Sequence, residues 1–187
     1  MCSSDLMQPL GELADELWRV VDTIPASGRV LFAAHKSWPR PTDPVMSAWN
    51  ALNCIREWRG DTHFGILLND DIGVVEAGLL HDAWMGYPKE WIPRSRGAED
   101  AEIAAALGNL ESRGYVTDGV VNEAGVAYRQ GLEDRTDVLC EIPWRAFGEV
   151  NTLKFLSIIE PVGQVYVDRI NQTAGDNWMP AARPRRR

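Results

Sequence analysis

The stretch LGNLESRGYVTDGVVNEAG, residues 107–125, decides the fold of this chain. Apolar residues recur at intervals of three and four up to this point, which predicts a helix over residues 98–113. Gly114 suits the end of that helix, and an Asp-Gly pair at 118–119, between two short β-branched runs, predicts a two-residue hairpin. Asn122 is a favourable N-cap for the helix that follows. Helix, tight hairpin and helix in this order are typical of half of a winged-helix domain.

The rest of the chain carries mostly helical patterns. Further helices are expected over residues 10–21, 30–35, 44–58, 64–68, 72–85 and 150–170. Residues 56–63 are expected to join two of them, because Gly60 suits the residue after a helix and Asp61 the cap of the next. Residues 86–97 contain two prolines and are expected to form a long loop. The predicted fold class is mainly α: a winged helix-turn-helix with one short β-hairpin wing and additional flanking helices.

The expected organisation has five parts. Residues 1–6, MCSSDL, match the translation of a common sequencing adapter, and we expect them to be an artefact. Residues 7–58 are expected to be N-terminal helices left from a larger N-terminal region, and residues 59–148 the winged-helix domain. A C-terminal helix over residues 149–172 and a disordered basic tail over residues 173–187 complete the prediction.

The composition is that of an ordinary globular protein and excludes several classes. No apolar run is long enough for a transmembrane helix, so no membrane partner is expected. The N-terminus lacks the basic and apolar regions of a secretory signal. The three cysteines include no CxxC pair, which argues against a disulfide framework and a zinc site. We therefore expect a cytoplasmic protein with no metal and no cofactor.

Two resemblances to known families extend this interpretation. Residues 107–116 resemble the recognition helix and following turn of MarR-type helix-turn-helix proteins, and residues 122–125, Asn-Glu-Ala-Gly, stand where that family often has Thr-Glu-Ala-Gly. Residues 29–148 resemble an uncharacterised actinobacterial helix-turn-helix family whose members carry a further N-terminal helical region. The markers are Leu31-Phe32-Ala33-Ala34-His35, Arg56-Glu57-Trp58-Arg59-Gly60-Asp61-Thr62-His63, Leu80-His81 and Arg135-Thr136-Asp137. The resemblance implies a winged-helix fold in a truncated member of that family.

The charge of the expected domain is unfavourable for DNA binding. The formal net charge of the chain is −8, and residues 60–140 hold six Lys and Arg against fifteen Asp and Glu. The helix expected to enter the major groove opens with acidic residues, whereas phosphate contacts need clustered Lys and Arg. Carboxylates at a helix N-terminus are also explained without any function, because they interact favourably with the helix dipole. The candidate DNA contacts are Lys89, Arg94, Arg96 and Arg113, of which the first three are equally consistent with solvated loop charges.

The three histidines are the candidates for a small-ligand site. His35, His63 and His81 all lie in segments that carry the wider resemblance, and Arg56, Arg59 and Asp61 are expected to share the site with them. The spacings between the histidines match no metal-binding motif. The alternative is structural, since each histidine could be a hydrogen-bonded group within or between helices.

Eight tryptophans are many for this length and could line an aromatic pocket, although core and interface packing explains them as well. The apolar residues of the last helix suit burial against a partner subunit or against the missing N-terminal region, and a homodimer is expected. The predicted function is a MarR-like transcriptional regulator that binds DNA and a small aromatic or apolar effector. The alternatives are a small-molecule-binding or accessory enzyme-like protein that does not bind DNA, and a structural or interaction module. No nucleophilic triad can be assigned, so an enzyme is not the expected class.

Overall fold

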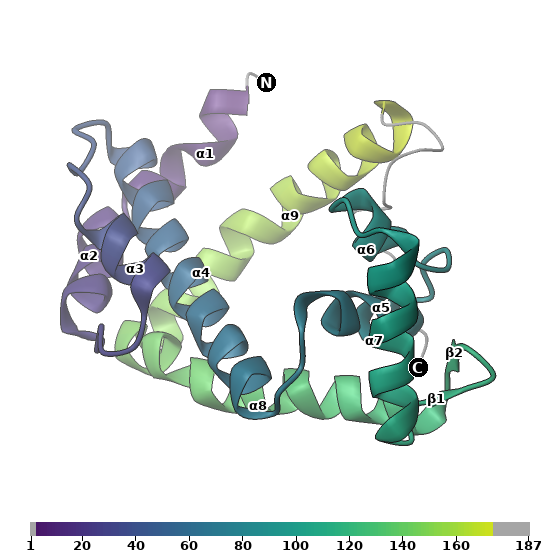
Figure 1. The fold of residues 1–187 in the computed structure, drawn as a ribbon. Coiled ribbons are helices and arrows are strands. Elements are labelled where there is room, and N and C mark those ends of the chain that lie inside the picture. Colours follow the sequence, from purple (N-terminus) through teal and green to yellow (C-terminus); the bar gives the residue numbers. More distant parts are fainter. Residues whose placement is uncertain (1–2, 174–187) are drawn as a thin grey trace. The chain divides into compact units, whose positions relative to one another are not determined.

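The computed structural model describes residues 3–173, which are almost entirely helical (Figure 1). These residues divide into two compact units. We call residues 3–62 with 137–173 the helical unit, and residues 63–136 the hairpin unit. Residues 1–2 of the expected adapter-derived start and residues 174–187 of the expected basic tail lie outside the described residues. The expectation of a mainly helical fold with one hairpin is confirmed.

The helical unit is built around the first part of α4, which begins at Pro44. The backbone N–H of Met46 donates to the Asp43 carboxylate at 2.8 Å, so the expected pairing of an Asp cap with a proline in the first turn is confirmed. Buried apolar side chains from several helices form the core, among them Leu17, Phe32 and Trp58. The helices of this unit are α1 (Ser3–Gly11), α2 (Ala14–Thr23), α3 (Val30–Lys36), part of α4 (Pro44–Asn69), part of α8 (Glu123–Phe147) and α9 (Glu149–Thr173).

The joint expected at residues 56–63 is wrong, because α4 runs through Gly60 without a break and ends at Asn69. Asp61 instead caps a different helix. Its carboxylate oxygens accept hydrogen bonds from the backbone N–H groups of Leu31 and Phe32 at 3.3 and 2.9 Å. Those N–H groups lie in the first turn of α3, where no partner exists within the helix itself. The sequence predicted that Asp61 caps a helix directly after it. Its carboxylate instead caps a helix that lies 30 residues earlier in the chain.

The hairpin unit packs α5 (Val74–Met85) against α7 (Asp100–Ser112) over a second apolar core. Leu80, Leu110 and Leu132 are fully buried there. The loop expected over residues 86–97 contains a short helix, α6 (Trp91–Ser95), that packs on α5. The carboxylate of Asp82 holds it by accepting the backbone N–H of Ile92 at 3.0 Å.

The expected hairpin is confirmed, with β1 (Val116–Thr117) and β2 (Val120–Val121) antiparallel. Both central residues of the turn have positive φ, 51° at Asp118 and 71° at Gly119, as a type I′ turn requires. Asn122 fixes the exit from the hairpin. Its side-chain oxygen accepts the N–H of Gly125 at 3.0 Å, and its side-chain amide donates to the carbonyl of Gly114 at 3.0 Å. The N-cap predicted for α8 is therefore confirmed.

Candidate nucleic-acid interface

Helix α7 presents one face to the core and the other to solvent. Ile103, Ala106 and Leu110 are buried on its inner side. The outward side is exposed and made of small or polar residues, namely Ala101, Glu102, Ala104, Ala105, Gly108, Asn109, Glu111 and Ser112. An exposed helix that runs directly into a tight hairpin has the geometry needed to enter a nucleic-acid groove. Its small side chains permit close approach, and Asn109 and Ser112 are the uncharged polar groups on that face able to bond to base edges.

The acidic start of α7 is explained by helix capping. The side chain of Glu102 accepts the backbone N–H of Glu99 at 2.9 Å, and the Glu99 side chain accepts the N–H of Glu102 in return. This reciprocal arrangement is a capping box, and negative charge at this end also favours the helix dipole. The carboxylates therefore stabilise the helix. They also place negative charge where a DNA-reading helix would approach phosphates.

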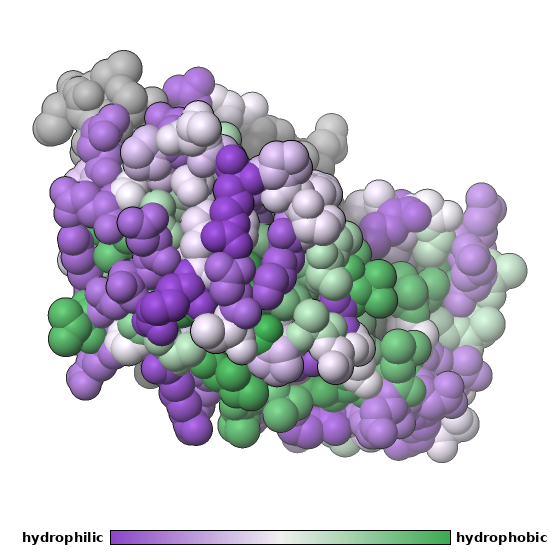
Figure 2. All heavy atoms as spheres, turned by 90° about the vertical axis from the view of Figure 1, so that its left-hand side faces the viewer, coloured by the Kyte–Doolittle hydropathy of each residue, from purple (hydrophilic) through white to green (hydrophobic). Residues whose placement is uncertain are grey.

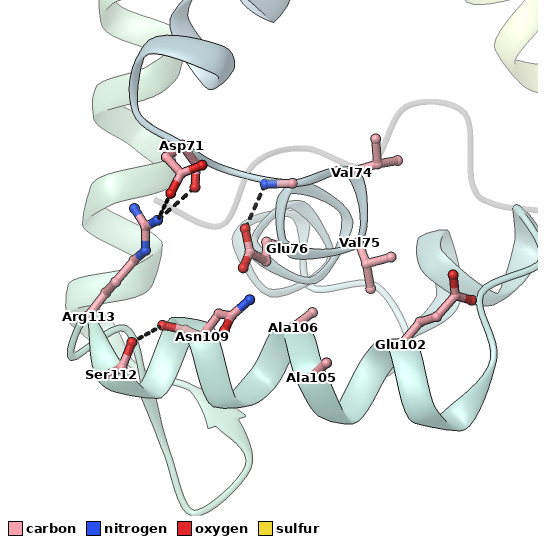
Figure 3. Close-up of a pocket in the computed structure, with 11 residues that line it drawn as sticks. Asp71, Val74, Val75, Glu76, Glu102, Ala105, Ala106, Asn109, Ser112 and Arg113 are labelled. Atoms are coloured by element: carbon pink, nitrogen blue, oxygen red, sulfur yellow. Dashed lines mark hydrogen bonds and ion pairs between the residues drawn. The ribbon is translucent and has the colours of Figure 1, made fainter.

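A groove of about 470 Å³ lies between the start of α5 and α7 (Figure 3). Asn109 and Ser112 line it from α7, and Glu76 lines it from α5. The Glu76 carboxylate accepts the backbone N–H of Gly73 at 2.6 Å and so closes the first turn of α5. Asp71 and Arg113 form an ion pair of 3.2 Å at one end. The groove thus has mixed polarity, with more carboxylates than cations.

Most of the predicted DNA-contacting cations are held by carboxylates. Lys89 lies 3.5 Å from Glu90, and Arg94 is paired at 2.8 Å with both Glu90 and Asp100. Arg113 has a structural role: it donates to the carbonyl oxygens of Asp70 and Asp71 at 2.8 and 2.7 Å and thereby holds the turn between α4 and α5.

Arg96 is exposed and forms no ion pair with any residue that the structure describes. It is therefore the predicted cation best able to contact a phosphate. The turn between α4 and α5 is also bonded to α8, because Asp70 within it pairs with Arg135 and accepts the hydroxyl of Tyr128. These contacts hold the pKa of the Asp70 carboxyl well below its usual range.

The three predicted histidines have different partners. His35 belongs to the helical unit, where its ring lies 4.2 Å from that of Trp38. His63 and His81 belong to the hairpin unit. The hydroxyl of Thr136 donates to the carbonyl of Leu132 at 2.7 Å, so Nδ1 of His63, 3.1 Å away, is the donor to that hydroxyl oxygen. Nδ1 of His81 accepts a hydrogen bond of 2.9 Å from Arg129.

The other residues predicted for the ligand site also have structural contacts. Arg56 pairs with its neighbour Glu57, and Arg59 pairs with Asp137 at 3.2 Å. Asp61 caps α3, as described above. These contacts link the segments that carry the sequence resemblance: residues 59 and 61 bond to residues 137 and 31–32, and residue 63 to residue 136. Arg59, Asp61, His63 and His81 therefore join different helices, whereas the contacts of His35 and Arg56 are local.

Sequence reasoning missed a buried ion pair in the hairpin unit. Arg129 and Glu133 lie 2.6 Å apart on α8, with side chains only 5% and 8% exposed. The guanidinium of Arg129 also lies over the ring of Trp84 at 4.7 Å, and its Nη1 has no hydrogen-bond partner among the described residues. The spacing of four residues on one helix is the sequence signal that could have indicated this pair. Burial could not be inferred from it.

The environment of His81 leads to a pH prediction. Burial, together with the charge of Arg129, lowers the pKa of His81 to about 4, while Glu133 acts in the opposite direction. The folded state therefore keeps the ring neutral, whereas the unfolded chain takes up a proton near pH 6.5. The stability that a neutral His81 provides is present above about pH 6.5 and is lost as the pH falls from there toward 4.

The measurement is urea unfolding of the wild type and of His81→Gln at pH 7.5, 6.0 and 5.0. We expect the wild type to lose more stability than the variant over this range. The comparison is needed because burial raises the pKa of Asp82 to about 6, which favours the folded state as the pH falls. Equal pH dependence in the two proteins would contradict the assignment.

Within residues 3–173, no group of three or more His, Cys, Asp or Glu is placed to hold a metal ion. In the same range, no helix combines the length and the apolar character needed to cross a membrane.

The geometry of the hairpin unit, with an exposed helix running into a hairpin and a capped helix after it, is that of a helix-turn-helix protein. Comparison with protein families matches residues 2–173 to a helix-turn-helix family, and the chain belongs to it. Comparisons with curated proteins and with solved structures found no match.

Proposed function

We propose that this chain is a winged-helix protein of the MarR-like type that acts as a transcriptional regulator. In this proposal α5 and α7 are the two helices of the helix-turn-helix, α7 enters the major groove, and the β1–β2 hairpin is the wing. The observation that carries the proposal is the exposed face of α7, which is free of large apolar side chains and leads directly into the hairpin. Membership of a helix-turn-helix family supports it.

The charges of the hairpin unit set the expected strength of binding. Carboxylates near Lys89, Arg94 and Arg113 compete with phosphates for these cations. Few counterions would then be released when DNA binds, and affinity would depend on a small number of phosphate contacts. Arg96, on the loop just before α7, is placed to make one of them.

The direct test is fluorescence anisotropy with a DNA duplex from the promoter of the protein's own gene, at 50 to 200 mM salt. Arg96→Gln is expected to weaken binding at low salt and to reduce the salt slope by about one. Arg145→Gln is the matched control, because Arg145 is also an exposed arginine but lies in the helical unit. If the folded wild type does not bind the duplex at 50 mM salt, DNA binding by this chain is excluded.

We further propose that the protein acts as a homodimer through α9. Val150, Leu153, Val165 and Tyr166 of this helix are between 51% and 81% exposed. Apolar side chains exposed in such number on one helix are typical of a surface that a partner covers. Exposed hydrophobic residues are not confined to α9: Figure 2, which views the molecule from the side of α2 and α3 in Figure 1, also shows hydrophobic groups exposed among hydrophilic ones. The measurement is the mass in solution by sedimentation: the wild type is expected to be a dimer, and Leu153→Glu is expected to weaken the dimer.

A second candidate function is a small-molecule-binding or accessory protein that uses the same scaffold without binding DNA. The observation that favours it is the pairing of Arg94 with two carboxylates and of Arg113 with the turn before α5, which leaves the predicted interface acidic. The two candidates differ in the anisotropy experiment. This second one requires the protein to bind a small ligand while remaining unable to bind the duplex.

A further inference from the structure

A separate pocket of about 340 Å³ lies wholly within the helical unit, between α4, the end of α8 and α9. Its walls include Trp49 and Trp58 from α4, Trp144 from α8, and Phe155 and Ile159 from α9. The volume is in the range of pockets that hold small organic molecules. None of these residues belongs to the interface proposed for DNA.

The aromatic walls are held in place by neighbouring groups. The indole N–H of Trp58 donates to the carbonyl of Pro25 at 2.9 Å, and the guanidinium of Arg29 stacks over its ring at 3.7 Å. The rings of Trp144 and Phe155 lie 5.6 Å apart. Such contacts fix side-chain rotamers, so the pocket is largely formed before a ligand arrives. Flat aromatic surfaces favour a flat, apolar ligand body.

The interior of the pocket offers few polar groups to a ligand, the side-chain amide of Asn53 and the thiol of Cys140 among them. Cys140, which lines it, is 7% exposed, and burial raises the pKa of its thiol, so the sulfur is neutral at physiological pH. A buried polar group without a hydrogen bond would cost free energy here. The part of a ligand that enters the pocket is therefore apolar.

The charged residues that line the pocket are both arginines, Arg56 and Arg59. The side chain of Arg56 is 74% exposed, which places its guanidinium at the solvent side. The ion pair with Glu57 engages one of its nitrogens, and a guanidinium has five N–H donors that suit a carboxylate. Arg59 is balanced by Asp137. A ligand with an apolar body and one anionic end would match both parts of the site.

We propose that this pocket binds a small aromatic carboxylate, with the ring system between Trp49, Trp58, Trp144 and Phe155 and the carboxylate on Arg56. The site belongs to the helical unit alone, so it does not depend on whether the hairpin unit binds DNA. It is also distinct from the predicted histidine site, with which it shares only the two arginines.

The test is calorimetric titration of the whole chain with 2-naphthoate and with 2-naphthamide, which has the same ring system without the charge. We expect 2-naphthoate to bind and 2-naphthamide to bind at least tenfold more weakly. Arg56→Gln should weaken 2-naphthoate about tenfold and leave 2-naphthamide unchanged, since one charge-assisted hydrogen bond contributes on this scale. Arg145→Gln, another exposed arginine on the helical unit that does not line the pocket, should change neither affinity.

Ile159→Trp fills the pocket and should abolish binding of 2-naphthoate. Because that substitution could disturb the core, Trp49→Leu is the second variant: Trp49 is 49% exposed, so its replacement should leave the circular dichroism spectrum unchanged and weaken binding several-fold. No binding of 2-naphthoate to the folded wild type, or unchanged binding in both variants, would overturn the site. Equal affinity for the two probes, unaffected by Arg56→Gln, would overturn the anionic class of ligand.

Discussion

Replacing Glu133 by leucine is expected to lower the free energy of unfolding by about 3–5 kcal/mol, because it leaves the charge of Arg129 buried without its partner. The two side chains are 2.6 Å apart and almost completely buried. The remaining contacts of Arg129 are the neutral nitrogen of His81 and the ring of Trp84, neither of which balances a full charge. Arg129→Met is also expected to lower the free energy of unfolding, since it removes the cation that lies 2.6 Å from the Glu133 carboxylate.

The double variant Arg129→Met/Glu133→Leu should lose much less stability than the sum of the single variants, because no unpaired charge stays buried. Urea unfolding followed by tryptophan fluorescence and circular dichroism measures all three. Arg145 and Glu141 provide the matched control, with the same residue types and spacing on the same helix but with side chains 78% and 50% exposed. Replacing either should cost less than about 1 kcal/mol. Additive losses in the Arg129 and Glu133 variants would contradict a mutually compensating pair.

The features of the fold that could be predicted from the sequence are those that neighbouring residues determine. The hairpin follows from Asp118 and Gly119, whose positive φ values few other residue pairs accept. The start of α8 follows from Asn122, which directly precedes the helix and accepts the N–H of Gly125 in its first turn. Both rules depend on backbone conformations within one turn, so long-range packing has little influence on them.

The features that could not be predicted depend on contacts between distant segments. Gly60 was expected to end a helix, yet α4 continues through it, because Trp58 and Thr62 on either side are buried and the packing of the unit holds the helix. Asp61 was expected to cap its own helix and caps α3. Arg113, a candidate DNA contact from its position alone, bonds to residues more than 40 positions earlier. In each case the sequence shows the residue type, but the residue that it contacts lies in a distant segment and could not be predicted.

The two candidate sites also combine features that could be predicted from neighbouring residues with features that depend on distant contacts. The acidic opening of α7 was visible in the sequence, but its capping role became clear only from the bonds between Glu99 and Glu102. The count of tryptophans indicated an aromatic surface without locating it. The pocket combines Trp49, Trp144 and Phe155 from three helices, and no spacing rule relates positions so far apart.

Gly125→Ala is expected to destabilise the hairpin unit by about 3 kcal/mol, near the upper end of the usual cost of overpacking. A Cβ at this position would lie 2.5 Å from the carbonyl oxygen of Tyr115 and 2.7 Å from a methyl group of Val121. That carbonyl accepts the backbone N–H of Asn122 at 3.0 Å, so it cannot move without breaking the bond that closes the hairpin onto α8. The requirement for glycine at the end of the Asn-Glu-Ala-Gly segment therefore has a steric cause.

Gly131→Ala on the same helix is the matched control, since a Cβ there meets nothing within 4 Å. It should raise stability by about 0.5–1 kcal/mol through the lower entropy of the unfolded chain. Urea unfolding compares the two variants, and hydrogen exchange at the amide of Asn122 reports on the hairpin itself, where Gly125→Ala should speed exchange. If both substitutions had the same effect on stability, the close approach of α8 to the hairpin would not be what requires glycine, and the α7–hairpin–α8 geometry on which the proposed DNA interface depends would lose its main structural support.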